Sequence, residues 1–200
     1  MSTLQKILIA LGAGILFFGF IILSTISSSY NTMITYDEEV KTAFSNVENQ
    51  YQRRSDLIPS LVATVKGAAN FEKDTLTAVI EARAKATSTN VNINDATAFQ
   101  AFQQNQAGLQ SALSKLMVVV EQYPELKANQ NFRDLQLDIS RTENRIATER
   151  GRFNETTKIY NTFIRRFPNN FIASWFAFDS AQLFKTTEEA KTVPTIDFNK

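Results

Sequence analysis

The chain has 200 residues, with 21 Lys and Arg, 20 Asp and Glu, and neither His nor Cys. Without Cys there are no disulfides, no thiol catalysis and no Cys-based zinc or iron–sulfur sites. Without His there are no Ser-His-Asp triads and no Glu-x-x-His pairs of the kind that hold two metals in a helical bundle. The net charge of +1 lacks the basic excess of nucleic-acid-binding domains, so we expect no nucleic-acid partner.

An uncharged apolar segment lies near the N-terminus. Residues 7–26 read ILIALGAGILFFGFIILSTI, a length that crosses a hydrocarbon core of about 30 Å. A cleaved signal peptide is the alternative, because Ser27, Ser28 and Ser29 are small residues near the end of the segment. The apolar part of a signal peptide is normally only about 7–15 residues long. The sequence therefore predicts a retained membrane-spanning helix within an N-terminal region of residues 1–29, in contact with the lipid bilayer.

Charge around this segment predicts its orientation. Lys6 precedes the span, and no basic residue follows it before Lys41. The positive-inside rule then places the N-terminus in the cytoplasm and the rest of the chain outside. Within the span, Ala10 and Gly14 form a small-xxx-small pair, so association of two copies into a homo-oligomer stays open.

Apolar residues in the body, residues 30–168, recur at steps of three and four, which is typical of amphipathic helices. The first stripe passes Pro59 without losing its phase, which predicts one long helix with a kink at that proline. This stripe consists of Val40, Phe44, Val47, Tyr51, Arg54, Ile58, Leu61 and Val65.

Three further helices are predicted. A second, shorter helix begins after Asn70 as its N-cap and ends near Thr87. A polar loop, residues 88–95, then supplies Asn94 or Asp95 as the cap of a third helix. A short connection from Pro124 leads to a fourth, longest helix that Pro168 ends. The body is therefore predicted to be an all-α antiparallel four-helix bundle with long helices. Its stripes include Phe71, Leu76, Val79 and Ile80, then Phe99, Phe102, Gln106, Leu109, Leu113, Leu116, Val120 and Tyr123, then Phe132, Ile139, Ile146, Phe153, Tyr160 and Phe167.

Arg54 is the only residue of the first stripe that is not apolar, so its guanidinium is expected to be buried and paired. Glu143 and Glu149 of the fourth helix are the candidate partners, and such a pair would fix the register of the helices. The alternative is a polar groove, with Arg53 and Asp56 nearby, that recognises a carboxylate or a phosphate. The sequence leaves both interpretations open.

A C-terminal tail, residues 169–200, is rich in aromatic residues and includes Trp175 and Phe176. We expect the tail to fold back and cap the open end of the bundle. Contact with the membrane surface, where Trp is favoured, is the alternative. Capping is preferred because residues 169–184 contain no basic residue that would attract anionic lipids.

Five segments resemble the LemA family in the order in which that family carries them. They read QYQRRSDLIPSLV at residues 50–62, the block around EAR at residues 72–86, YPELKA at residues 123–128, the run from ENRI at residue 143 to YN and FP at residues 160–168, and PTIDF at residues 194–198. The resemblance implies an N-terminal membrane helix followed by a helical bundle, in a family without an established enzymatic activity.

We expect no enzymatic activity and no cofactor, because a close-packed bundle offers no cleft for catalytic carboxylates and the chain has no glycine-rich phosphate loop. The predicted function is a scaffold or accessory subunit in the bacterial cytoplasmic (inner) membrane, with a periplasmic body that binds a membrane-protein partner. The alternative is a small-ligand or stress-sensing module that uses the Arg53/Arg54 region. The candidate structural or interaction residues are Arg53, Arg54, Asp56, Pro59, Glu143, Glu149, Trp175 and Phe176.

Overall fold

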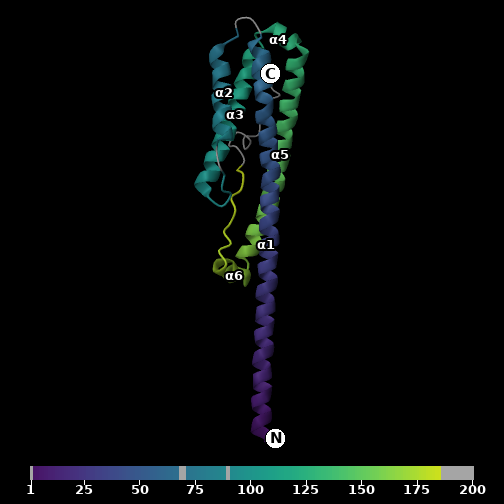
Figure 1. Cartoon of the computed structure of the whole chain (residues 1–200), viewed down its shortest axis with the longest axis vertical. Helices are drawn as coiled ribbons and strands as arrows, with labels where there is room; N and C mark the ends of the chain where they lie inside the picture. Colours follow the sequence, from purple (N-terminus) through teal and green to yellow (C-terminus); the bar gives the residue numbers. More distant parts are fainter. Residues whose placement is uncertain (1, 68–70, 89–90, 186–200) are drawn as a thin grey trace, which may run out of the picture.

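The computed structural model describes residues 2–67, 71–88 and 91–185, and in these residues it contains six α-helices and no strand (Figure 1). Four of them, α1, α2, α3 and α5, are long and run side by side as the predicted all-α bundle. The helices are α1 (Thr3–Lys66), α2 (Lys73–Thr87), α3 (Ala96–Val120), α4 (Pro124–Ala128), α5 (Gln130–Arg165) and α6 (Asn169–Trp175).

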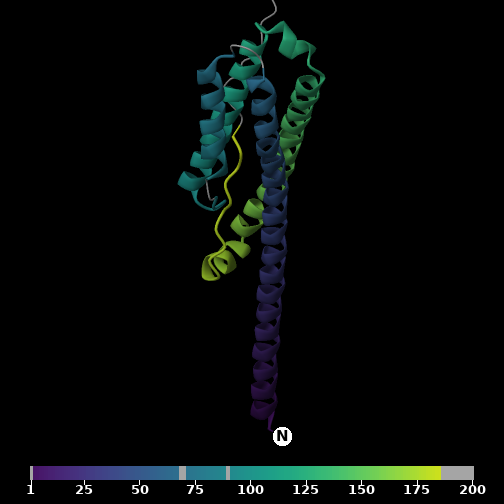
Figure 2. The same ribbon diagram turned by 45° about the horizontal axis from the view of Figure 1, so that its top comes forward.

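Helix α1 is a single element of 64 residues that contains both the apolar segment and the first helix of the bundle. Its N-terminal part projects beyond the body as an isolated helix (Figures 1 and 2). Among the described residues it is the one helix long and apolar enough to cross a membrane, and none of its apolar window is buried. The helix continues through Pro59, as the unbroken stripe predicted.

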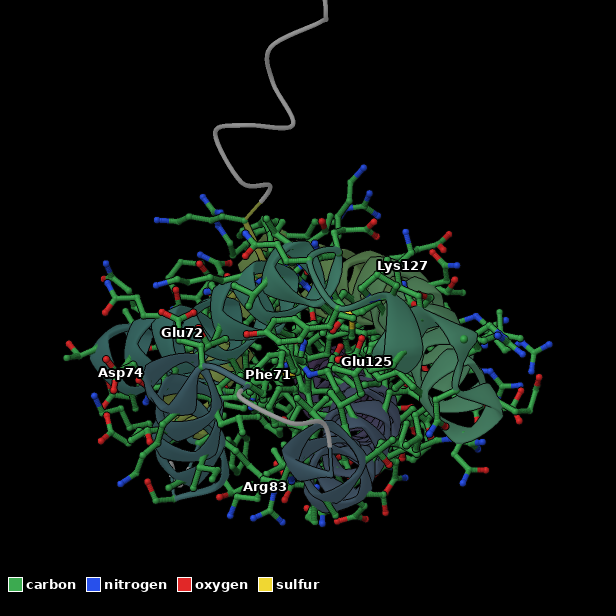
Figure 3. All side chains as sticks on the ribbon, turned by 90° about the horizontal axis from the view of Figure 1, so that it is seen from above. Phe71, Glu72, Asp74, Arg83, Glu125 and Lys127 are labelled. Atoms are coloured by element: carbon green, nitrogen blue, oxygen red, sulfur yellow. The ribbon has the colours of Figure 1, made fainter. Side chains whose placement is uncertain are left out.

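The helices associate as two antiparallel pairs. Helix α5 packs along the body part of α1, which is the most extensive contact in the molecule, and α2 packs on α3. Helix α6 lies against α1 and α5 at the end of the body nearest the N-terminal segment (Figure 1). At the opposite end, the rings of Phe71 and Tyr123 meet with their centroids 4.9 Å apart. Figure 3, seen from that end, shows Phe71 near the middle of the bundle and Asp74 and Lys127 at its periphery.

The bundle interior consists of two apolar clusters with a polar layer between them. The cluster near the N-terminal segment is aromatic, and the rings of Phe44, Phe99, Phe153 and Phe184 contact one another with centroids 4.9–6.5 Å apart. The distal cluster is mostly aliphatic. Four buried polar residues separate the two clusters: Arg54, Ser55, Gln106 and Thr142.

The N-terminal caps of α2 and α3 can be compared with the caps predicted from the sequence. Asp95 caps α3 by accepting hydrogen bonds from the backbone N–H groups of Thr97 and Ala98, as predicted. The N-cap of α2 is Glu72, and Asn70, the predicted cap, lies outside the described residues.

The aromatic tail divides into a buried part and an exposed part. After α6, Ala177 takes a left-handed conformation with φ of 57°, and the chain then runs back along the bundle as an extended segment. Ile172, Ala181 and Phe184 are buried in the aromatic cluster. These three residues of the predicted tail lie against the bundle, whereas Phe171, Trp175 and Phe176 are exposed. Residues 186–200 of the predicted tail lie outside the described residues.

Candidate functional site

Arg54 lies at the centre of the polar layer, with only 1% of the residue exposed. Its Nη1 donates a hydrogen bond of 2.6 Å to Oε1 of Glu143 on α5, and its Nη2 donates one of 2.6 Å to Oε1 of Gln106 on α3. The guanidinium also lies 5.2 Å from the ring centroid of Tyr51. The expected burial of Arg54 and its pairing with an acid of the last long helix are thus present in the structure.

Gln106 extends this network to a further helix. Its Nε2 donates a hydrogen bond of 3.1 Å to the backbone carbonyl of Ala86 at the end of α2. One arginine and one glutamine therefore connect α1, α2, α3 and α5. Because both groups are buried, removing either leaves polar atoms without partners at the middle of the bundle. Gln106 was not among the candidate residues predicted from the sequence. Its polar side chain in an otherwise apolar stripe could have indicated a buried hydrogen bond.

The other predicted residues do not join this network. Arg53 is exposed, and Asp56 accepts a hydrogen bond of 2.7 Å from Gln52 on its own helix. Glu149, the second candidate partner of Arg54, instead pairs with Arg152 across 2.8 Å. Pro59 is an exposed position within α1. The structure therefore brings together Arg54 and Glu143 of the predicted set.

A groove opens beside Arg54 between α3 and α5, two helices that make little direct contact. Its volume is about 580 Å³. The expectation that a close-packed bundle leaves no cleft is therefore wrong, because apolar stripes identify buried faces but not the distance between two helices. Amide side chains are frequent in its lining, namely Gln100, Gln103, Gln104, Gln106, Gln110 and Asn144.

The extended tail segment lies at one end of this groove, and two asparagines of α5 hold its backbone. The side chain of Asn161 donates a hydrogen bond of 2.8 Å to the carbonyl of Ala181 and accepts one of 3.0 Å from the N–H of the same residue. Asn154 makes the same two contacts with Phe184, both at 2.9 Å. The two asparagines lie seven residues apart, so they project from one face of the helix. The hydrogen bonds from both asparagines go to backbone N–H and C=O groups of the extended chain, so they do not depend on its side chains.

The electrostatic character of the groove is basic. Its charged lining groups are Arg54, Arg150, Lys185 and the carboxylate of Glu143. Glu143 is paired with Arg54, which leaves Arg150 and Lys185 as the positive groups at the groove surface. Burial raises the pKa of the Tyr51 hydroxyl above its usual value, while the positive charges of Arg150 and Arg54 oppose that rise. The groove therefore suits a ligand with hydrogen-bonding amides and negative charge.

The described residues contain no group of three or more His, Cys, Asp or Glu side chains that could hold a metal ion. The polar centre of the groove consists of one arginine, one paired carboxylate and several amides, and it offers recognition through hydrogen bonds.

Comparison with known proteins gives one family and a small set of relatives. The model of the LemA family matches residues 43–198. Magnetosome proteins MamQ 1 and MamQ 2 of Paramagnetospirillum magneticum are each 26% identical over 182 residues, and MamQ of Magnetospirillum gryphiswaldense is 26% identical over 181 residues. Protein LemA of Metamycoplasma hominis is 24% identical over 158 residues. These alignments cover 79–82% of this chain and about two thirds of each relative, 66–69%.

Proposed function

Because the chain belongs to the LemA family, whose match over residues 43–198 includes most of the helical body, we propose that it is a non-enzymatic scaffold that binds another membrane protein. The family assignment confirms the resemblance carried by the sequence motifs. Its N-terminal apolar helix and its LemA and MamQ relatives fit a single-pass membrane protein. The names of these relatives point to structural or accessory proteins, which supports the absence of catalysis in this proposal.

We place the chain in the bacterial cytoplasmic membrane with its body on the periplasmic side. Lys6 before the span and the absence of basic residues up to Lys41 support this orientation. The continuity of α1 supports a retained anchor, since cleavage after residues 27–29 would cut the helix directly before Tyr30 and Met33. Met33 is fully buried in the aromatic cluster, so the body and the span share one element.

The observation that carries the scaffold function is the groove between α3 and α5 and the way it already holds an extended chain. Of the residues that line the groove, Gln103 on α3 accepts a hydrogen bond of 3.2 Å from the N–H of Lys185, and Arg150 on α5 donates one of 3.2 Å to the carbonyl of Lys185. Asn154 and Asn161 bind the tail backbone outside the groove lining. An extended polypeptide presents alternating N–H and C=O groups that such amides can satisfy. The occupant we propose is therefore an extended, acidic segment of a membrane-protein partner, with Arg150 and Lys185 pairing with its carboxylates.

A photocrosslinking experiment in intact membranes tests this function. A photoreactive amino acid at Gln110, in the groove, is expected to capture a partner, whereas the same amino acid at Ala101 on the opposite side of α3 is not. The variant Ala147→Trp fills the groove from α5 and should abolish the Gln110 product. Ala101→Trp, a matched substitution outside the groove, should preserve it. A Gln110 product that survives Ala147→Trp would contradict the proposal.

The small-ligand alternative receives less support from the same geometry. Both terminal nitrogens of Arg54 are engaged by Glu143 and Gln106, and the residue is 1% exposed. Arg53, the second residue of that hypothesis, does not line the groove. A ligand would therefore meet the amides, Arg150 and Lys185 before it met Arg54.

A further inference from the structure

Four aromatic side chains remain on the surface around α6. The residues are exposed by 82% at Phe167, 65% at Phe171, 80% at Trp175 and 47% at Phe176, and we call this set the aromatic foot. The rings of Phe167 and Phe171 meet with centroids 6.0 Å apart, and those of Trp175 and Phe176 meet at 6.3 Å. Ile172 and Ala173 of the same short helix are buried against the bundle. Helix α6 thus has one side packed on the bundle, while Phe167, Phe171 and Trp175 at and beside it are largely exposed.

The aromatic foot lies directly beside the end of the membrane span. The ring of Phe176 is 4.8 Å from that of Tyr30 on α1, measured between centroids. Tyr30 follows Ile26, the last residue of the apolar segment, by four positions, or about 6 Å along the helix. Both ribbon views show α6 as the part of the body closest to the projecting N-terminal helix (Figures 1 and 2). The aromatic foot is therefore at the depth where a membrane crossed by α1 would have its headgroups.

The charged residues at this end of the body suit a position among lipid headgroups. Arg165 and Arg166 are exposed and directly precede Phe167. Residues 165–178 contain these two arginines and no acidic residue. Arginines attract lipid phosphates, while Trp and other aromatic rings are favoured at the boundary between hydrocarbon and water. The earlier expectation of weak attraction considered only residues 169–184 and so left out this pair.

We propose that the aromatic foot inserts into the headgroup region of the membrane that α1 crosses, with Arg165 and Arg166 contacting lipid phosphates. The body is then held at two places, by the span and by α6. The contact of Phe176 with Tyr30, four residues after the apolar segment, identifies lipid as the occupant. This inference is independent of the groove and of its proposed partner.

Trp175 is the single Trp of the chain, so its fluorescence reports on the aromatic foot alone. The full-length protein is reconstituted into vesicles of phosphatidylcholine and phosphatidylglycerol, with or without phosphatidylcholine brominated in the upper acyl chain. Brominated lipid is expected to quench Trp175, and aqueous iodide is expected to quench it weakly. Strong quenching by iodide without quenching by brominated lipid would overturn the proposal. Protection from both quenchers would also overturn it, because a protein would then cover the surface.

Two variants give the controls. Val118→Trp combined with Trp175→Phe moves the fluorophore to a position that is 68% exposed near the distal end of α3. This protein should lose quenching by brominated lipid and gain quenching by iodide. Phe167→Ser combined with Phe171→Ser retains Trp175 but removes two anchoring rings. Its Trp175 should become more accessible to iodide at an unchanged far-ultraviolet circular dichroism spectrum, and unchanged accessibility would argue against insertion.

Discussion

Arg54 and Glu143, 89 positions apart in the sequence, form a 2.6 Å ion pair in which the arginine is buried and the side chain of the glutamate is 27% exposed. The asymmetry matters energetically. The glutamate retains some contact with water, whereas the arginine depends on Glu143 and Gln106 for the partners of its terminal nitrogens. The Nε of Arg54 has no hydrogen-bond partner among the described residues.

Arg54→Ala is expected to reduce the free energy of unfolding by about 3 kcal/mol, the lower end of the cost of breaking a buried pair, because Glu143 keeps some hydration. The measurement is urea unfolding of the full chain in detergent micelles, followed by circular dichroism. Arg53→Ala is the matched control, since the neighbouring side chain is exposed, and should change stability by no more than about 0.5 kcal/mol. Equal stability of the two variants would show that the Arg54 network does not hold the bundle together.

Asn161→Ala is expected to release the tail near Ala181, because the side-chain amide of Asn161 makes two hydrogen bonds to the backbone of that residue. At about 0.5–1.5 kcal/mol for each hydrogen bond, the loss is about 1–3 kcal/mol. Hydrogen exchange measured by mass spectrometry should show faster exchange of the amide of Ala181, which donates to Asn161. Asn144→Ala, on the same helix but away from the tail contacts, serves as the comparison. Identical exchange of the Ala181 amide in both variants would show that Asn161 does not hold the tail in place.

Tyr160 predicts a loss of stability at alkaline pH. Burial is the main cause that raises the pKa of its hydroxyl to about 12, and the hydroxyl donates a 3.0 Å hydrogen bond to the carbonyl of Asp179. The usual tyrosine pKa is about 10, so folding favours the neutral form. The stabilisation is complete below about pH 10 and is lost as the pH rises toward 12. The thermal midpoints of the wild type and of Tyr160→Phe should therefore converge between about pH 10 and 12. A constant difference over this range would show that the pKa of Tyr160 is not raised in the folded protein.

The orientation of the chain can be tested by thiol labelling, because the absence of Cys gives a clean background. Asn94→Cys lies at an exposed position of the body, and Ser2→Cys lies before the span. A membrane-impermeant maleimide should label the first variant in cells whose outer membrane is permeable to it, and the second only after lysis. The reverse pattern would place the body in the cytoplasm.

Sequence patterns predicted the helices and the burial of Arg54 well, since both depend on periodicity along a single helix. A charged residue in an otherwise apolar stripe must be paired, and the candidate acids lie on one predicted helix. The choice between Glu143 and Glu149 could not be made in advance, because it depends on how far α5 is shifted along α1. Gln106 carried a similar signal, but an amide at a stripe position is a weaker indicator than a guanidinium.

The periodicity of apolar residues could not predict the groove between α3 and α5 or the packing of the extended tail segment on α5. Residues 178–185 are held by hydrogen bonds from Asn154 and Asn161 to their backbone, and backbone contacts leave no repeating pattern of side chains in the sequence. The side chains of Ala181 and Phe184 are buried as well, but two positions in an extended segment make no helical stripe. Asn154 and Asn161 each directly follow an apolar stripe residue, Phe153 or Tyr160, but their partners are distant in the chain. The width of the groove depends on the separation of α3 and α5, a tertiary property.

The unbroken course of α1 has a mechanical consequence. From Ile26 to Lys66 the helix rises about 60 Å, so a change of about 10° in the tilt of the span would move the far end by about 10 Å if the helix turned as a rigid rod. Helix α5 packs along the same element and would be carried with it, while α2 and α3 are connected to the pair chiefly through the Arg54 layer and the apolar clusters. Local thinning of the membrane, or crowding around the span, would in this way alter the separation of α3 and α5 tens of ångströms away.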